Sequence, residues 1–176
     1  LVGERADVRP WREGGTGGDA SNPVQPEELP HRLEGGTPNV FGIAGLREGL
    51  RVVGARGVDA ILRHERRLLK RLLSSMRRAE AWRWFGAERV LLDRDGEGRV
   101  GLVAFERPGL PPADLATRLE REFDLAVRAG LHCAPYAHRH LGTFPAGAAR
   151  ISVGLSTTDA DIDAAAAALD AIAATS

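Results

Sequence analysis

The sequence predicts an α/β domain, in an α+β arrangement, in which helices pack on a small sheet. Three observations carry this prediction. Hydrophobic residues make up 43% of the 176 residues, which is enough for a packed core. From Phe41 onward, apolar residues recur at helical spacing in several segments. Toward the C-terminus these helical segments alternate with short apolar runs that are typical of strands.

The first half of the chain predicts an irregular segment followed by two helices. Residues 10–39 are rich in glycine and proline and show no periodicity, so we expect a disordered or functional segment there. A helix is predicted over 41–53, and a longer one over 57–80. The longer helix has an apolar stripe and an arginine-rich face, which we interpret as solvated surface. The stripe consists of Val58, Ile61, Leu62, Leu68, Leu69, Leu72, Leu73 and Met76.

The second half predicts shorter elements. Strands are expected at 90–92 and 100–105, joined through the turn formers of residues 93–96. The closing helix should start near Thr158, because Asp159 and Asp161 would then lie in its first turn, where the helix dipole favours acids. The elements expected between them are a helix at 112–123, a strand at 125–127, a helix at 135–141 and a strand at 150–153.

Composition limits the classes of partner. There are 24 basic and 24 acidic residues, and a formal net charge of zero gives no support to a nucleic-acid partner or an anionic membrane surface. Cys133 is the only cysteine, which fits a reducing, cytoplasmic location. No apolar run approaches the ~20 residues that cross a bilayer, so no membrane partner is expected. The sequence begins with Leu1 rather than Met, which suggests that an upstream part is missing.

Three stretches of sequence carry a family resemblance. The first runs from Arg32 to Asn39 and reads R-L-E-G-G-T-P-N, followed by a glycine-containing apolar segment. The second reads R-A-G-L-H-C-A-P over 128–135, and the third reads A-R-I-S-V-G-L-S-T-T over 149–158. In this order and spacing they resemble class V pyridoxal-phosphate-dependent aminotransferases, and within them the cysteine desulfurase family.

The resemblance implies a C-terminal portion of a fold-type I transferase. Residues 1–53 would be a remnant of the large cofactor-binding domain with its active-site loops, and residues 54–176 would be the C-terminal small domain. The implied activity converts L-cysteine to L-alanine and leaves a persulfide on the enzyme, with pyridoxal 5'-phosphate as cofactor. The implied partners are the substrate cysteine, a second subunit in a homodimer and a sulfur-acceptor protein.

The family's cofactor-binding lysine, which forms a Schiff base, would lie upstream of Leu1. The only lysine of the sequence, Lys70, falls on a predicted helix that has no counterpart in the matched motifs. We therefore expect the isolated chain to be inactive as an enzyme.

Cys133 is the candidate catalytic residue. A desulfurase needs a thiolate that attacks the substrate sulfur. Pro135 suits the first turn of a helix, and a helix N-terminus, together with the nearby Arg128 and His132, would favour a thiolate at this position. The alternative is a small buried residue, because free cysteine is among the most buried residue types.

The resemblance makes Arg150 and His132 substrate-binding residues. A guanidinium grips a planar carboxylate through two parallel hydrogen bonds, and an arginine in an apolar strand needs such a partner. The alternative for Arg150 is a structural salt bridge. Gly36 and Thr37 are the candidate cofactor-binding residues, since a hydroxyl beside a glycine lets the chain approach a phosphate closely. A plain loop leading into the first helix remains the alternative.

Two other patterns are assigned no site. The histidines at 132, 138 and 140 have no regular ligand spacing, so no metal is expected. The glycine run at 14–18 is not placed between a strand and a helix, so it predicts no nucleotide-binding loop. The alternatives to a desulfurase are a class V aminotransferase or lyase that does not use the thiol, or a non-catalytic domain that lacks the Schiff-base lysine.

Overall fold

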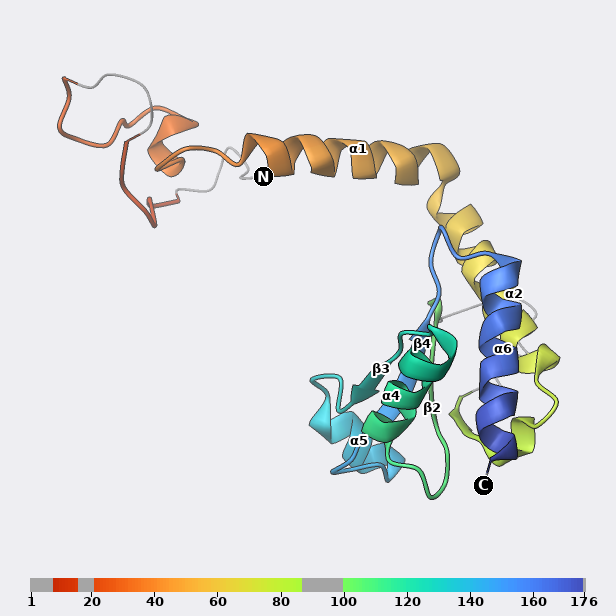
Figure 1. The fold of residues 1–176 in the computed structure, drawn as a ribbon. Coiled ribbons are helices and arrows are strands. Elements are labelled where there is room, and N and C mark those ends of the chain that lie inside the picture. The colour runs from red at the N-terminus through yellow and green to blue at the C-terminus, as the bar shows by residue number, and fades with distance from the viewer. Residues whose placement is uncertain (1–7, 16–20, 87–99, 176) are drawn as a thin grey trace. The chain divides into compact units, whose positions relative to one another are not determined.

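The computed structural model describes residues 8–15, 21–86 and 100–175. The chain divides into two compact units, Leu1–Ala55 and Arg56–Ser176 (Figure 1). This division lies close to the boundary expected between residues 53 and 54. The assignment of residues 1–53 to a cofactor-binding domain stays a prediction.

The first unit contains a short 3-10 helix, η1 (His31–Leu33), and the helix α1 (Val40–Arg56). The helix predicted over 41–53 is confirmed within α1. The N–H of Gly42 donates to Oδ1 of Asn39 at 2.9 Å, which satisfies one of the free donors at the start of a helix. No residue of α1 is buried, and Phe41 is 92% exposed.

The second unit contains a pair of neighbouring helices, α2 (Val58–Ser75) and α6 (Asp159–Ala174) (Figure 1). The second part of the predicted apolar stripe is buried. It consists of Leu68, Leu69, Leu72 and Leu73 of α2, and of Met76 just after the helix. On the polar face, Arg67 and Arg71 form ion pairs with Asp159 and Asp163 of α6. These pairs lie on a solvated surface, as expected for the arginine-rich face.

The end predicted for α2, residue 80, is wrong. Helix α2 stops at Ser75, the next residue, Met76, is extended, and a separate 3-10 helix, η2 (Ala79–Ala81), follows. Directly after Met76, the carboxylate of Asp170 accepts hydrogen bonds from the backbone N–H groups of Arg77 and Arg78 at 2.9 Å. These bonds from α6 hold the departing chain in a direction that does not continue the helix.

The sheet has four antiparallel strands in the order β1-β2-β4-β3. The strands are β1 (Arg83–Phe85), β2 (Leu102–Glu106), β3 (Arg128–Gly130) and β4 (Ala148–Ser152). The expected strands at 100–105 and 150–153 are thus confirmed with shifts of one to two residues. The strand expected at 90–92 and the turn at 93–96 lie outside the described residues.

The strand predicted at 125–127 is wrong, because that segment is irregular and connects the end of a helix to the next strand. Helix α4 (Pro112–Phe123) is confirmed with the predicted bounds. It ends at Asp124 in the left-handed conformation, and the N–H of Leu125 donates to the carbonyl of Leu119 at 3.1 Å. Leu125 therefore packs on the core as part of the helix cap, and pairing begins only at β3.

Two further predictions of helices are confirmed. Helix α5 (Pro135–Leu141) has the predicted bounds. Helix α6 begins at Asp159, and Thr158 and Asp161 cap it reciprocally through a side-chain bond to each other's backbone N–H. No helix of the described residues is long and apolar enough to cross a membrane.

The two faces of the sheet differ in chemistry. On the core face, Val103 pairs with Ile151 and Phe105 pairs with Ala149, and all four are buried. Because side chains alternate along a strand, the neighbouring residue Arg150 lies on the opposite face. That outer face positions the candidate site.

Candidate functional site

The loop between β3 and α5 positions Cys133. After Gly130, both His132 and Cys133 adopt the left-handed conformation, with φ of 52° and 61°. The N–H of Ala134 donates to the carbonyl of Leu131 at 2.8 Å and closes the turn. Cys133 is exposed as a result, which contradicts the alternative of a small buried residue.

The charged neighbour of Cys133 is Arg128. Nη2 of Arg128 lies 3.8 Å from Sγ of Cys133. Arg128 is at the start of β3, five residues before the cysteine, and the tight loop returns the thiol to it. A guanidinium at this distance attracts a thiolate, or an anionic sulfur attached to it.

Arg150 lies directly opposite Arg128 in the pairing of β4 with β3. Like charges opposite each other on one face of a sheet destabilise the pairing. Among the described residues no carboxylate forms an ion pair with Arg150, and its buried Nε has no hydrogen-bond partner. The alternative of a structural salt bridge is therefore not supported within the described part of the chain.

His132 is held beside these arginines. Its Nε2 lies 3.1 Å from the carbonyl oxygen of Ala148, while its Nδ1 is buried without a partner. Burial lowers the pKa of His132 below its ordinary value, and the positive charge of Arg150 lowers it further. The bond to Ala148 acts in the opposite direction and does not outweigh them. The imidazole is thus held neutral near neutral pH.

The other two histidines of this region, His138 and His140, have different surroundings. His138 is buried, and its Nδ1 lies 2.7 Å from Oγ1 of Thr143. Its ring lies 5.6 Å from that of His132. His140 is exposed on the same helix. In the part of the chain that the structure describes, no group of three or more potential ligands is arranged to hold a metal ion.

Gly36 and Thr37 lie in the first unit and are described there alone. Gly36 has φ of +95°, and its N–H donates to the carbonyl of Gly15 at 2.9 Å. A Cβ built at Gly36 would meet no atom within 4 Å, and Thr37 is exposed. The turn is open on its outer side, so the Thr37 hydroxyl is accessible to a ligand.

Comparison with known proteins agrees with this geometry. The profile of the family described as aminotransferase class-V matches residues 3–165. The chain belongs to this family. A probable cysteine desulfurase from Pyrococcus abyssi is 37% identical over 107 residues, which cover 61% of this chain and 25% of the relative. One from Halalkalibacterium halodurans is 35% identical over 138 residues, covering 78% of this chain and 31% of the relative.

A solved structure shows the same fold. The apo cysteine desulfurase from Thermococcus onnurineus NA1 superimposes with a TM-score of 0.69 at 30% sequence identity, over 82% of this chain and 34% of that one. The predicted fold, an α/β part of a fold-type I transferase, is therefore confirmed. The chain spans about a quarter to a third of the length of these relatives.

The family resemblance implies a cofactor-binding lysine, so the position of Lys70, the only lysine of the sequence, is relevant. Lys70 is exposed on α2, whose neighbouring side chains pair with α6. Cys133, His132 and Arg150 belong to the loop and strands of the sheet's outer face. Within the second unit, Lys70 therefore has no structural link to the candidate site.

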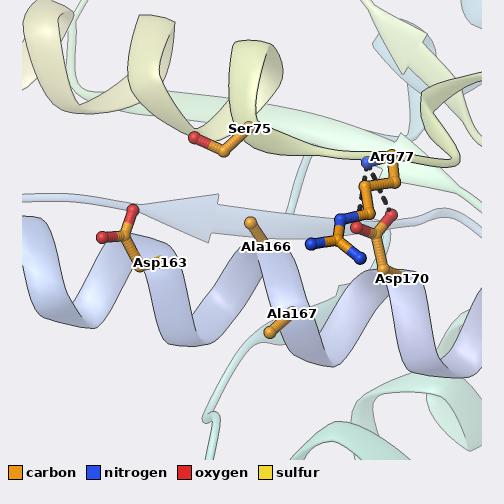
Figure 2. A pocket seen from close by; sticks show the side chains of 6 residues that line it. All are labelled: Ser75, Arg77, Asp163, Ala166, Ala167 and Asp170. Atoms are coloured by element: carbon orange, nitrogen blue, oxygen red, sulfur yellow. Dashed lines mark hydrogen bonds between the residues drawn. The ribbon is translucent and has the colours of Figure 1, made fainter.

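A hollow between α2 and α6 holds none of the predicted site residues. Figure 2 shows Asp170 bonded to the backbone of Arg77 at one end, with Asp163 at the other. Asp163 is paired with Arg71, so both carboxylates already have partners within the chain. The hollow, of about 410 Å³, has small side chains on its floor. It is lined by Ser75, Arg77, Asp163, Ala166, Ala167 and Asp170.

The candidate site was thus only partly visible in the sequence. The structure brings together Cys133, His132 and Arg150, while Gly36 and Thr37 belong to the other unit. Sequence reasoning noted Arg128 only as a nearby charge, and its contact with the thiol depends on the left-handed turn. A pair of consecutive non-glycine residues with positive φ has no clear signature in the sequence.

Proposed function

We propose that the protein acts in the removal of sulfur from L-cysteine, giving L-alanine and a persulfide on Cys133. The observation that carries the proposal is the exposed thiol of Cys133 in contact with the guanidinium of Arg128. The names of the two relatives described above support it, since both are probable cysteine desulfurases. The whole reaction is proposed for the complete enzyme.

Cys133 is the nucleophile of the proposed reaction. Its thiolate attacks Sγ of the substrate, so that a sulfur–sulfur bond forms while the substrate's Cβ–Sγ bond breaks. The electron pair of the broken bond stays with the substrate carbon, which takes up a proton to give L-alanine. Arg128 is placed to attract the thiolate before attack and the persulfide after it.

Arg150 is the proposed anchor of the substrate carboxylate. It has no ion-pair partner among the described residues, and its side chain lies on the outer face of the sheet, which also carries Arg128. A carboxylate bound between the two guanidiniums would relieve their electrostatic repulsion, and this relief favours binding.

The residues present fit the phosphate group of pyridoxal 5'-phosphate. Gly36 and Thr37 form an open turn with a free outer side and an accessible hydroxyl, and we propose that they contact the phosphate across a dimer. When bound, the cofactor accepts electron density from the substrate amino acid. Because Lys70 lies on α2, we propose that the 176 residues alone do not turn over cysteine.

The homodimer, the acceptor protein and the location are proposals of the same kind. A persulfide on an exposed cysteine is accessible to the thiol of a second protein. A free, exposed thiol also fits a reducing cytoplasm.

The test is a hybrid in which residues 3–165, the part that matches the family profile, replace the corresponding segment of the Halalkalibacterium relative. With Cys133 intact, the hybrid should release alanine and carry a persulfide when given L-cysteine. Cys133→Ser should abolish persulfide formation, because a serine hydroxyl is a far weaker nucleophile toward sulfur. Full sulfur transfer by Cys133→Ser would instead favour an aminotransferase or lyase that does not use the thiol. Arg150→Ala should weaken cysteine binding, and Arg150→Lys should restore it only in part.

A further inference from the structure

Four buried polar side-chain atoms lack a hydrogen-bond partner among the residues that the structure describes. Two are the indole Nε1 atoms of Trp82 and Trp84, which pack around Phe105 in the core. The other two are Nδ1 of His132 and Nε of Arg150, both in the candidate site. Burying a polar atom without a partner is unfavourable, so an unpaired set within one site indicates an interaction still to be made.

The geometry fixes the tautomer of His132. A backbone carbonyl can only accept a hydrogen bond, and Nε2 lies 3.1 Å from the carbonyl oxygen of Ala148. Nε2 therefore carries the hydrogen. In the neutral ring Nδ1 is then a lone-pair acceptor, the one acceptor among the four unpaired atoms.

The charged surroundings keep the ring in that neutral state. Arg150 on β4, Arg128 on β3 and His138 on α5 all oppose a positive charge on His132, and burial opposes it more strongly. None of the groups acting on the ring is acidic. Nδ1 is thus an unpaired acceptor on a ring in a cationic environment.

Arg150 supplies the matching donor. Its Nε–H can only donate, and it has no acceptor. Ala148 and Arg150 are two residues apart on β4, so their side chains lie on the same face. The bond from His132 to the Ala148 carbonyl holds the ring beside β4, two residues from Arg150, and the charge of Arg150 acts on it.

We propose that His132 is a positioning residue whose Nδ1 accepts a hydrogen bond from Nε–H of Arg150. The pair forms as the guanidinium turns toward the ring. It fixes the guanidinium plane and leaves the two Nη groups together to grip a carboxylate end-on. The inference rests on the proposed function in giving Arg150 the substrate carboxylate. It replaces the expectation that His132 contacts the substrate itself.

The pairing is tested on the full 176-residue chain by nitrogen-15 NMR. Long-range correlations of the histidine rings should show His132 as a neutral imidazole protonated on Nε2 at neutral pH. The Nε–H of Arg150, identified by its loss in Arg150→Lys, should be shifted and should exchange with water more slowly than that of the exposed Arg121. An Nδ1–H tautomer or an imidazolium at neutral pH would overturn the proposal.

Variants separate pairing from packing. His132→Phe keeps an aromatic ring without an acceptor and should abolish the slow exchange of the Arg150 Nε–H. His132→Asn places an amide oxygen near the position of Nδ1 and should restore it in part. His140→Phe, on the exposed face of α5, is the matched control and should leave the signal unchanged. Slow exchange that persists in His132→Phe, or that is lost equally in His132→Asn, would refute pairing through Nδ1.

These readouts do not depend on sulfur chemistry. If His132→Phe fails to fold, the tautomer in the unaltered chain and the His132→Asn spectrum still decide the question. Full sulfur transfer by Cys133→Ser would contradict the proposed function and would not affect the proposed His132–Arg150 pair. Failure of the NMR test would remove the pair and leave the desulfurase proposal intact.

Discussion

Gly147→Ala should destabilise the second unit strongly, and more than Gly142→Ala does. Both glycines lie between α5 and β4, with φ of +81° and +73°. An alanine in this left-handed region costs about 1–2 kcal/mol at either position. The two differ in their surroundings. A Cβ at Gly142 would meet nothing within 4 Å, whereas one at Gly147 would overlap the backbone carbonyl of Gly130 and lie 2.7 Å from its Cα.

The overlap involves backbone, so a side-chain rotation cannot relieve it. Either β3 must move away from β4, or the turn before β4 must open. Forcing extra volume into a packed site costs about 1–3 kcal/mol, so the total for Gly147→Ala is about 2–5 kcal/mol. In a domain of this size, 1 kcal/mol shifts the melting temperature by about 4 °C. Gly147→Ala should therefore melt about 4–12 °C below Gly142→Ala.

The assay is thermal unfolding followed by circular dichroism, together with the rate at which Cys133 reacts with a thiol reagent. Gly130 lies at the start of the loop that positions Cys133, so a displaced β3 should change that rate in Gly147→Ala and leave it unchanged in Gly142→Ala. Equal melting temperatures for the two variants would contradict the close backbone packing of Gly147 on Gly130.

Three further predictions concern the core, a helix cap and the site. Phe105→Ala should lower the unfolding free energy by about 3–5 kcal/mol in urea denaturation, because the fully buried ring contacts two tryptophans. Thr158→Ala should cost about 1 kcal/mol. The backbone N–H of Thr158, and then its hydroxyl, lower the pKa of Asp161 below 3.8, so this stabilisation is present above that pH and is lost as the pH falls. The variant keeps the backbone bond and loses only the hydroxyl bond, so its loss of stability in acid should be slightly shallower. Arg150→Gln should raise the pKa of His132 toward its ordinary 6.5 in an NMR titration, and an unchanged pKa would contradict the repulsion assigned to Arg150.

The elements that were predicted well are marked by residues within their own segments of the sequence. Pro112 and Pro135 mark the first turns of α4 and α5, and Thr158 marks the cap of α6. The errors arise where distant contacts decide. The end of α2 depends on Asp170, more than ninety residues away, and no property of residues 76–80 shows it.

Short strands were the other weak point. β1 spans three residues, too few for alternation to stand out from chance. It forms because its middle residue, Trp84, stacks on Phe105 of the neighbouring strand, with ring centroids 4.9 Å apart. The apolar run at 125–127 suggested a strand, but Leu125 and Val127 are apolar because they pack against the core, and Leu125 bonds back to the end of α4.

The roles of the candidate site residues were harder to predict from the sequence than the core. Sequence motifs identified Cys133 and Arg150, but their chemistry depends on which backbone groups they meet. The acceptor role of His132 follows from the carbonyl of Ala148, and a carbonyl is the same at every position of a sequence. The pairing of Arg128 with Arg150 likewise requires the register of β3 on β4.

The register of β3 on β4 also lowers the stability of the sheet at Arg128 and Arg150. The core face of β4 pairs Ile151 with Val103, so the strand would form with many residues at position 150. Two guanidiniums placed opposite each other weaken the β3–β4 pairing, and in the described structure no acid relieves them. A feature that opposes folding and has no structural benefit is expected where a ligand supplies the missing partner. A carboxylate anion bound between Arg128 and Arg150 should therefore stabilise the second unit, and a titration of propionate, which is L-alanine without its ammonium group, that leaves its melting temperature unchanged would argue against that role.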